Sequence, residues 1–389
     1  MTIAYGRSDI GVVRDVNQDA LFVDAELGLF IICDGMGGHA AGEVASELAC
    51  RTIARHVGEI RDTFSSMPLQ LRERALAGGV LAASEAVHLA AKENGEHAGM
   101  GCTATAVLVV GQDTTIAHVG DCRVYLVSGD EVEVLTTDHT LASDLARRGL
   151  ISAQEVAHHH QAHVLTRSVG THAAVEVETH TVPTRPGDRL LLMSDGVSHY
   201  VPSEEWLVEI AGSSPLSEVP ARLIAFANQA GGRDNATVIA VEIDIDDEHL
   251  AEPALHRHVA VLGASVLFRG LSLADLSYIA AHCEIRDVPP GAAVTDAEGQ
   301  QELIVVLRGF ISSASPPVTL TAGASVGLDV LGPPTNTRPH FTSDGATVAV
   351  LTAPKLLAMV RRRPQLGVTV LTRLVEKLSA AGVHAGHLG

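Results

Sequence analysis

The sequence predicts an α/β protein with two domains. Hydrophobic residues make up 46% of the 389 residues, which is enough for extended cores. Over residues 5–245, short apolar runs of strand type alternate with longer alanine-rich runs of helical type. An acidic segment without periodicity, 244–254, follows the last of these strands, and the pattern changes beyond it. We therefore expect a first domain at 1–245, an acidic linker at 246–254 and a second domain at 255–389.

The elements of the first domain are predicted from apolar runs and the turn residues around them. We expect strands at 27–33, 104–110, 115–119, 123–127, 189–194 and 236–243. We expect helices at 42–57, 69–94, 144–148, 203–211 and 215–230. Their alternation along the chain is what predicts a mixed α/β domain.

The second domain is predicted to be a small β-roll with helices. Ser272 lies three residues before Asp275, which is a capping-box-like beginning for a short helix. Short strands over 284–294 and 302–315 are separated by Pro-Gly and Glu-Gly turns. An amphipathic helix over 364–382 then closes the domain. Its apolar residues at a spacing of four are Leu366, Val370, Leu374 and Leu378.

Charge and cysteine usage exclude some classes of function. The formal net charge of −19 argues against nucleic-acid binding, because affinity for a phosphate backbone comes from Lys and Arg. The five cysteines are dispersed without a CxxC pair, which favours a reduced, cytoplasmic compartment. The N-terminal region is charged where a signal peptide would be apolar, and no run of 18 apolar residues occurs. We therefore expect no export signal and no membrane span.

Aspartates stand repeatedly at the ends of the apolar strands. Asp34 follows the run LFIIC and Asp195 follows RLLLMS, and each is followed by a glycine. Asp121 follows a third apolar run, Asp234 precedes a fourth, and Asp19 lies just before a fifth. A buried carboxylate is costly unless it is paired or coordinated, and few basic residues lie beside these. Their expected partner is a hard divalent cation, which takes carboxylate oxygens, backbone carbonyl oxygens and water.

The glycine after the first of these aspartates fits the same chemistry. Gly35 has no Cβ, so its carbonyl can approach an ion closely. Two ions about 4 Å apart can clamp a phosphoryl group for in-line attack by water. The pattern thus predicts metal-assisted hydrolysis without a covalent enzyme intermediate. A single Asp-Gly after a strand is commonly only a turn, so the prediction depends on the repetition.

Seven segments, taken together and in order, resemble the motifs of a known family. They are RSDIGVVRDVNQD, CDGMGGHAAGEVAS, GMGCTATAV, HVGDCRVYL, LTRSVG, GDRLLLMSDGVS and GGRDNATVIAV, within residues 5–245. The family is the metal-dependent serine/threonine protein phosphatases, the PPM or type 2C class, in a bacterial version. The resemblance implies a sandwich of two antiparallel β-sheets flanked by helices, with the metal centre at one end.

The resemblance also implies a ligand set. Asp34, Asp195 and Asp234 would coordinate two manganese or magnesium ions. The Gly35 carbonyl would bind the second ion, and Asp19 would act directly or through water.

Two further positions match functional residues of the family. Asp121, together with Asp195, matches the place where bacterial members bind a third ion. Arg14 matches the phosphate-binding arginine, and its guanidinium fork suits two phosphate oxygens. The expected catalytic residues are therefore Arg14, Asp34, Asp195 and Asp234.

The sequence departs from the family pattern at several positions. Gln18 stands where many members have Glu, which predicts weaker metal binding without loss of activity. Met36 stands where some members have a histidine proposed as general acid, so water is the expected proton donor. His39 can substitute for that histidine or serve a structural role, and His199 stands where Asp is common. The residues expected around the metal ligands are Gln18, His39, Asn235 and His199.

The segment 138–170 corresponds to the variable flap of the family, next to the active site. It contains histidines close enough in sequence to bind zinc: His158, His159, His160 and His163. No cysteine or acidic ligand completes a tetrahedral set, so a solvated flap that contacts substrate is the favoured interpretation.

The second domain resembles a cyclic-nucleotide-binding domain that has lost its ligand chemistry. Residues 267–311 resemble the front half of such a domain, and 326–331 lie where the phosphate-binding cassette begins. Leu328 replaces the glutamate that holds the ribose, and Asp344 replaces the arginine that pairs with the cyclic phosphate. We expect the fold without nucleotide binding, and a regulatory, docking or self-association role.

The leading hypothesis is a phosphatase that removes phosphate from Ser or Thr of proteins and opposes a cytosolic Ser/Thr kinase. One alternative is a catalytically weak module that binds phosphoproteins, which Gln18 and His199 slightly support. Another alternative is a phosphatase gated by a cyclic nucleotide.

Overall fold

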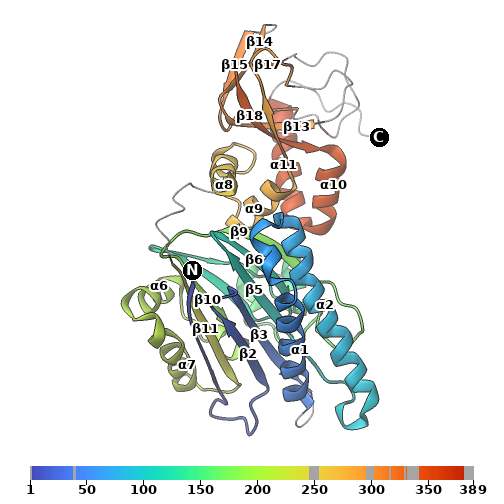
Figure 1. Ribbon diagram of the computed structural model, residues 1–389, viewed down its shortest axis with the longest axis vertical. Coiled ribbons are helices and arrows are strands. Elements are labelled where there is room, and N and C mark those ends of the chain that lie inside the picture. Colours follow the sequence, from blue (N-terminus) through green and yellow to red (C-terminus); the bar gives the residue numbers. More distant parts are fainter. Residues whose placement is uncertain are drawn as a thin grey trace. The chain divides into compact units, whose positions relative to one another are not determined.

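The protein consists of two compact units, Met1–Leu250 and Ala251–Gly389 (Figure 1). The structure is a computed structural model. It describes residues 2–37, 41–244, 254–294, 302–314, 317–327, 330 and 341–380. Each unit has its own sheets and its own core.

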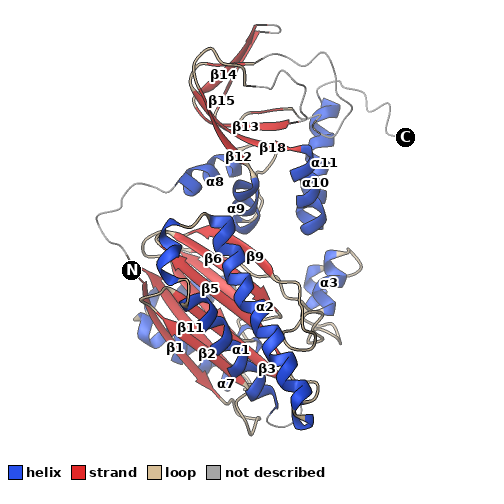
Figure 2. Ribbon diagram, turned by 45° about the vertical axis from the view of Figure 1, so that its right-hand side comes forward, coloured by secondary structure: helices blue, strands red, loops and turns tan. Residues whose placement is uncertain are grey.

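Two antiparallel β-sheets form the centre of the first unit (Figure 2). One sheet has the order β1 (Thr2–Asp9), β11 (Ala236–Ile243), β10 (Arg189–Met193), β7 (Arg123–Ser128) and β8 (Glu131–Val134). The other has the order β2 (Asp19–Asp24), β3 (Leu29–Met36), β5 (Ala104–Val110), β6 (Asp113–Val119) and β9 (Glu178–Pro183). The short strand β4 (Gly101–Cys102) pairs with the end of β3.

Helices cover the outer face of each sheet. The long helices α1 (Ala41–Gly58) and α2 (Leu69–Glu93) pack on the β3 sheet (Figure 2). The helices α6 (Glu204–Ser213) and α7 (Val219–Gln229) pack on the β10 sheet. In the described part of the chain, no helix is both long and apolar enough to cross a membrane.

The alternation of side chains along β3 explains why the two sheets also pack on each other. Leu29 and Ile31 contribute to the core under α1 and α2. Phe30 and Ile32 are equally buried, and their side chains must point to the opposite face of the strand. That face meets the β10 sheet, as the contacts between β1 and β2 show. The result is the predicted sandwich of two sheets between helices.

The predicted elements agree with the structure where apolar runs are long. Strands β5 and β11 have the predicted bounds. Helix α1 is longer than predicted by one residue at each end, and α2 ends one residue earlier than predicted. Strand β3 ends three residues beyond the predicted limit, because it continues to pair through Asp34 with β2 and through Gly35 with β4.

Other elements were wrong in extent or were missed. The predicted helix 215–230 is a short 3-10 helix, Leu216–Glu218, followed by α7, which carries a proline in its first turn. The helix expected at 144–148 is α3 (Leu141–Arg147), which begins earlier because the Thr140 hydroxyl accepts a hydrogen bond from the Ser143 N–H. Further short helices are Arg61–Ser66, Gly95–His97, α4 (Ala153–Val156) and α5 (Asp195–Ser198).

The second unit has two small sheets and four helices among its described residues. One sheet has the order β12 (Glu284–Val288), β18 (Ala346–Thr352), β13 (Glu302–Arg308) and β16 (Ser325–Val326). The other has the order β15 (Pro317–Thr321), β14 (Phe310–Ala314) and β17 (Thr342–Ser343). The helices are α8 (Ala254–Ala264), α9 (Leu273–His282), α10 (Ala353–Arg362) and α11 (Pro364–Ala380). Helix α9 begins where predicted, because the Ser272 hydroxyl accepts a hydrogen bond from the Asp275 N–H.

Packing of α1 on the β3 sheet makes a large contribution to the stability of the first unit. Ile53 of α1 is fully buried in that core. We expect Ile53→Ala to lower the free energy of unfolding by about 2–5 kcal/mol, because it leaves a cavity between helix and sheet. Urea unfolding followed by tryptophan fluorescence tests this, since Trp206 of α6 is the single tryptophan of the chain.

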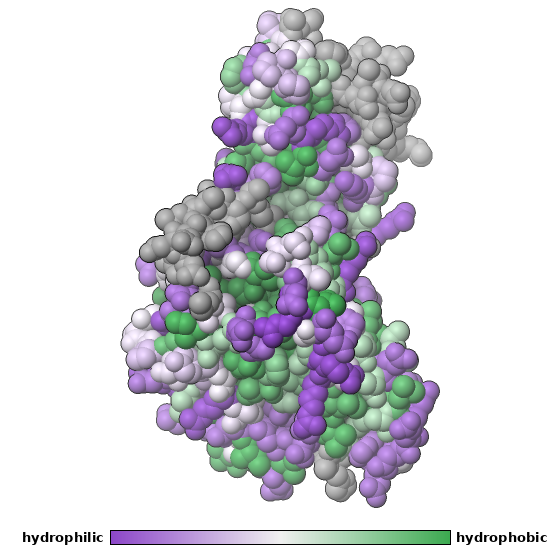
Figure 3. Space-filling view, viewed as in Figure 1, coloured by the Kyte–Doolittle hydropathy of each residue, from purple (hydrophilic) through white to green (hydrophobic). Residues whose placement is uncertain are grey.

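The control for this change lies on α2. Figure 3 shows hydrophilic and hydrophobic residues interspersed over the visible face of the first unit. Leu89 of α2 is 50% exposed, so Leu89→Ala should change the unfolding free energy by less than about 1 kcal/mol. Equal losses for the two substitutions would contradict the helix-on-sheet core.

Candidate active site

Five aspartates lie at one end of the two sheets, as the sequence predicts. The register of β2 and β3 places Asp19 directly opposite Asp34. Asp195 begins α5 immediately after β10, and Asp234 lies just before the adjacent strand β11. Asp121 lies in the turn between β6 and β7. These strand ends meet because every pairing among them is antiparallel.

Hydroxyl groups hold two of these aspartates in place. The Asp34 N–H donates to the Thr103 hydroxyl at 2.9 Å, and the Thr103 N–H donates to the Asp34 carbonyl at 2.8 Å. Asp19 Oδ2 accepts hydrogen bonds from Ser194 (2.9 Å) and Thr237 (2.6 Å). Sequence reasoning missed these three hydroxyls. A signal for them existed, since each lies in a segment that carries the family resemblance.

The aspartates repel one another when they are charged. Burial, with the charges of Asp195 and Asp234, raises the pKa of Asp19 to about 7 against the effect of its two hydrogen bonds. Burial, with the charge of Asp195, raises the pKa of Asp121 to about 8. The pKa of Asp34 is also well above its usual range, because of burial and the neighbouring carboxylates.

These residues fit divalent cations bound by oxygen. Asp19 Oδ1 and Asp195 Oδ1 are buried atoms without a hydrogen-bond partner among the described residues. Such atoms lack compensation for lost hydration, and a hard cation supplies it. Gly35 fits for an additional reason: a Cβ there would lie 2.1 Å from the Gly42 carbonyl oxygen and 2.5 Å from that of Gln18. A side chain at position 35 would therefore displace the backbone around the site.

Arg14 lies at the same end of the sheets, with its guanidinium directed at a carboxylate. Its Nη2 is 2.8 Å from Asp234 Oδ2, and its side chain is 49% exposed. The hydrogen bond to Asp234, helped by the charges of Asp34 and Asp195, raises the pKa of Arg14. The predicted phosphate-binding arginine is thus at the site, and in this structure it is paired with an aspartate.

Asn235 organises the loop that carries Arg14. Its side-chain nitrogen donates to the carbonyl oxygens of Ile10 (2.9 Å) and Val16 (3.0 Å). Its side-chain oxygen accepts from the backbone N–H of Gln18 at 2.8 Å. The Gln18 carbonyl in turn accepts from the Gly35 N–H at 3.0 Å. Asn235 and Gln18 therefore lie next to the expected metal ligands, and the hydrogen bonds named here join them to backbone groups.

A cleft of about 870 Å³ opens over this end of the sheets. Its floor carries Asp34, Asp121, Asp195 and Asp234. Other lining residues belong to the flap or directly follow it. Those of the flap are His163, Leu165, Thr166, Arg167 and Ser168, and those after it are Thr171, His172, Ala174, Val175 and Glu176. Met36 also lines the cleft and carries no exchangeable proton. A phosphorylated side chain entering the cleft would reach the carboxylates with the flap beside it.

The histidines singled out by the sequence do not form one group. His39 lies outside the described residues. The rings of His159 and His160 lie 4.4 Å apart, whereas the ring of His163 packs edge-on against His199 at 5.1 Å. Nδ1 of His199 lies 3.8 Å from Asp195 Oδ2. Burial lowers the pKa of His199, while the charge of Asp195 acts in the opposite direction.

The fold and the carboxylate-lined cleft define a metal-dependent hydrolase. Residues 7–234 match the family model described as protein phosphatase 2C. This match spans more than half of the chain, so the protein belongs to the protein phosphatase 2C family.

Relatives and solved structures agree with this assignment. The chain is 36% identical over 239 residues to the serine/threonine phosphatase stp of Listeria innocua, covering 61% of this chain and 94% of that protein. A crystal structure of the Mycobacterium tuberculosis serine/threonine phosphatase PstP/Ppp superposes with a TM-score of 0.57 and 34% identity. That superposition covers 63% of this chain and 99% of the mycobacterial one.

A further solved structure bears on the metal. It is the catalytic domain of the serine/threonine protein phosphatase PstP in complex with two manganese ions, at a TM-score of 0.54 and 34% identity. It covers 63% of this chain and 99% of its own length. Protein phosphatases 2C use manganese or magnesium, and the aspartates of this chain are the oxygen ligands that such ions prefer.

The raised pKa values predict how stability depends on pH without metal. Between about pH 4 and 8 the folded protein binds more protons at Asp19 and Asp121 than the unfolded chain does. The stability contributed by their protonated forms is therefore lost as the pH rises through this window. We expect the melting temperature of EDTA-treated protein to fall between pH 5 and pH 8, measured by differential scanning fluorimetry.

Manganese should reverse that loss, because the ions offset the repulsion. At a fixed manganese concentration that is a hundred times the Kd at pH 8, the expected gain at pH 8 is about 2.7 kcal/mol, or about 5–10 °C. This gain should be larger at pH 8 than at pH 5. Asp130→Asn, which neutralises an exposed aspartate in the β7–β8 turn, should leave the pattern unchanged. An equal gain at both pH values would show that the buried aspartates do not bind the ions.

Proposed function

We propose that the cleft hydrolyses phosphoserine and phosphothreonine in proteins, with two manganese or magnesium ions held by Asp34, Asp195, Asp234 and the Gly35 carbonyl. The chain is a metal-dependent protein serine/threonine phosphatase by family. The observation that carries the proposed ligand set is the convergence of mutually repelling, partly unpaired carboxylates on the cleft floor. Bound ions would supply an activated water and the positive charge that stabilises the transition state.

The surrounding residues position this floor. Asp19 is fixed by Ser194 and Thr237, and its remaining oxygen Oδ1 is available to an ion or to water around one. Asp121 is suited to a third ion shared with Asp195. Together with Asp19, the four aspartates of the floor make five carboxylates, one more than two divalent ions need for charge balance.

Arg14 is proposed to bind the substrate phosphate. Its guanidinium fork matches two phosphate oxygens, and its half-exposed side chain can turn from Asp234 toward an anion in the cleft. Asn235 supports this role because it holds both ends of the loop 10–18. Substrate phosphate would thus compete with Asp234 for Arg14.

The natural substrates are proposed to be proteins phosphorylated by a Ser/Thr kinase in the cytoplasm. All five cysteines are free thiols, which is consistent with a reducing compartment. The alternative of a binding-only module is less well supported, since the departure at Gln18 leaves the aspartates on the cleft floor in place.

The second unit is proposed to be a cyclic-nucleotide-binding-type roll that does not bind nucleotide and serves regulation, docking or self-association. The family match ends at residue 234 and does not reach this unit. In support, Asp344 is exposed in the turn before β18 and accepts a hydrogen bond from the Ser312 hydroxyl at 3.3 Å. Leu328 lies outside the described residues.

Removal of a metal ligand tests the proposed function. We expect manganese-dependent hydrolysis of a phosphothreonine peptide, abolished by EDTA and lowered more than about a hundredfold by Asp34→Asn, because loss of a ligand weakens metal binding. Asp130→Asn is the matched control, since its carboxylate is exposed and outside the cleft. Failure of the wild-type protein to hydrolyse any phosphopeptide with any divalent ion would refute the proposal.

Substitution of Arg14 tests phosphate binding. Arg14→Ala should lower kcat/KM by about 10- to 100-fold, since a hydrogen bond to a charged group contributes about 1.5–3 kcal/mol. Arg14→Lys should recover only part of this, because Lys lacks the fork. Arg7 is exposed in β1 and does not line the cleft, so Arg7→Ala should be neutral. Steady-state kinetics on one phosphopeptide with saturating manganese separates these outcomes, and an unchanged kcat/KM for Arg14→Ala would contradict the role.

Nucleotide binding by the second unit is tested with the full chain. Calorimetric titration with cyclic AMP and with cyclic GMP should show no micromolar binding, because a carboxylate at position 344 repels the cyclic phosphate. Phosphatase activity should be the same with and without either nucleotide. Micromolar binding, or a change in activity, would instead support gating by a cyclic nucleotide.

A further inference from the structure

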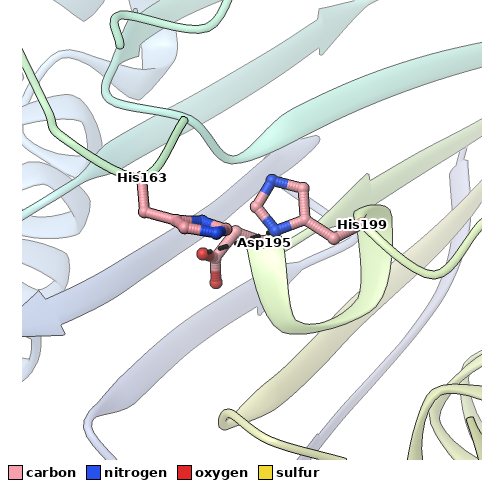
Figure 4. A group of neighbouring side chains, drawn as sticks. All are labelled: His163, Asp195 and His199. Carbon is pink, nitrogen blue, oxygen red and sulfur yellow. Dashed lines mark ion pairs between the residues drawn. The ribbon is translucent and has the colours of Figure 1, made fainter. Parts of the chain in front are cut away.

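His163, Asp195 and His199 form a compact group beside the carboxylate floor (Figure 4). One ligand atom of each residue lies within 4.8 Å of the ligand atoms of the other two. Among the described residues, no other three His, Cys, Asp or Glu side chains bring their ligand atoms this close together. Figure 4 shows the two imidazoles and the carboxylate directed toward one another.

The three side chains come from two separate parts of the chain. Asp195 and His199 lie one helical turn apart, at the first residue and the C-cap of α5. His163 comes from the flap and is exposed. The ring contact of His163 with His199 and the contact of His199 with Asp195 therefore connect the flap to the carboxylate floor.

The ligand chemistry of this group differs from that of the floor. Two imidazole nitrogens and one carboxylate oxygen are ligands that zinc prefers, whereas magnesium and manganese prefer oxygen alone. In a tetrahedral zinc site with bonds of about 2.0–2.2 Å, ligand atoms lie about 3.4 Å apart. Closure from the present spacing therefore requires a shift of about 1 Å, which an exposed flap residue can supply.

We propose that His163, Asp195 and His199 form an inhibitory site for zinc or a similar nitrogen-preferring divalent ion, and that this site shares Asp195 with the manganese or magnesium centre. Two consequences follow from the position of the ligands. An ion there takes an oxygen of Asp195, which is also a proposed ligand of the manganese or magnesium centre. It also ties His163 to α5 and so restrains the flap wall that continues through Leu165 and Thr166 in the cleft. Both effects lower turnover.

The binding experiment uses cobalt(II) as a spectroscopic substitute for zinc. Four-coordinate cobalt with nitrogen ligands absorbs strongly in the visible region, and six-coordinate cobalt with oxygen ligands absorbs weakly. The full-length protein is titrated with cobalt in saturating magnesium, so that the oxygen ligands of the floor are already occupied. We expect one strongly absorbing cobalt site that zinc displaces.

Two variants test the histidine ligands, and a third is the control. His163→Ala and His199→Ala should each weaken cobalt binding by at least about tenfold, since even changes around metal ligands cost this much. His160→Ala is the matched control: His160 is exposed in the same flap and packs against His159. Wild-type absorption in both His163→Ala and His199→Ala would overturn the site. His163→Ala keeps the test decisive if His199→Ala does not fold.

The regulatory consequence is tested separately, as the ratio of activity with and without micromolar zinc in saturating manganese. We expect a ratio well below one for the wild type and His160→Ala, and a ratio near one for His163→Ala. Equal inhibition of all three proteins would mean that zinc acts at the carboxylate floor, and would overturn the inhibitory role. The cobalt spectrum does not depend on turnover, so it tests the site even if the proposed phosphatase activity fails.

Discussion

Mutual repulsion among partly buried carboxylates is the constraint on which the rest of this site depends. Folding brings Asp19, Asp34 and Asp195 to one end of the sandwich, where burial raises the pKa values of Asp19 and Asp34 and so disfavours their charged forms. The hydroxyl groups of Ser194 and Thr237 donate hydrogen bonds to only one oxygen of Asp19. Oδ1 of Asp19 and Oδ1 of Asp195 have no hydrogen-bond partner among the described residues. The protein therefore has a site that is electrostatically incomplete by itself. In the proposed function, divalent cations complete it and attract the substrate phosphate.

The pairing of strands within the two sheets fixes the positions of these aspartates. Antiparallel pairing fixes Asp19 opposite Asp34, and it aligns the end of β10 with the beginning of β11. The cores under α1 and α7 hold these strands in register. By contrast, Arg14, which is proposed to bind the substrate phosphate, and His163, which lines the cleft, lie in connections: the loop 10–18 and the flap. The carboxylates thus lie at the ends of rigid strands, while the other residues of the site lie in loops.

Much of the sandwich and the aspartate positions could be predicted, because both follow from local patterns. Strand β5 is one apolar run, and Asp34 directly follows the apolar run that forms the neighbouring strand β3. Edge strand β1 was missed because its alternation of exposed and half-buried residues gives no strong signal. The pairing of His163 with His199 could not be predicted, since it joins residues 36 positions apart (199 − 163 = 36) through the fold of the flap. The same holds for the pairing of Arg14 with Asp234.

The most direct test of the central claim is the location of manganese in crystals of the full chain, by anomalous diffraction at the manganese edge. If the carboxylates exist to hold cations, two strong anomalous peaks should lie within coordination distance of Asp34, Asp195 and Asp234. A third peak near Asp121 is compatible with the same chemistry. Crystals grown in excess manganese at pH 8 without a peak at these aspartates would contradict the claim.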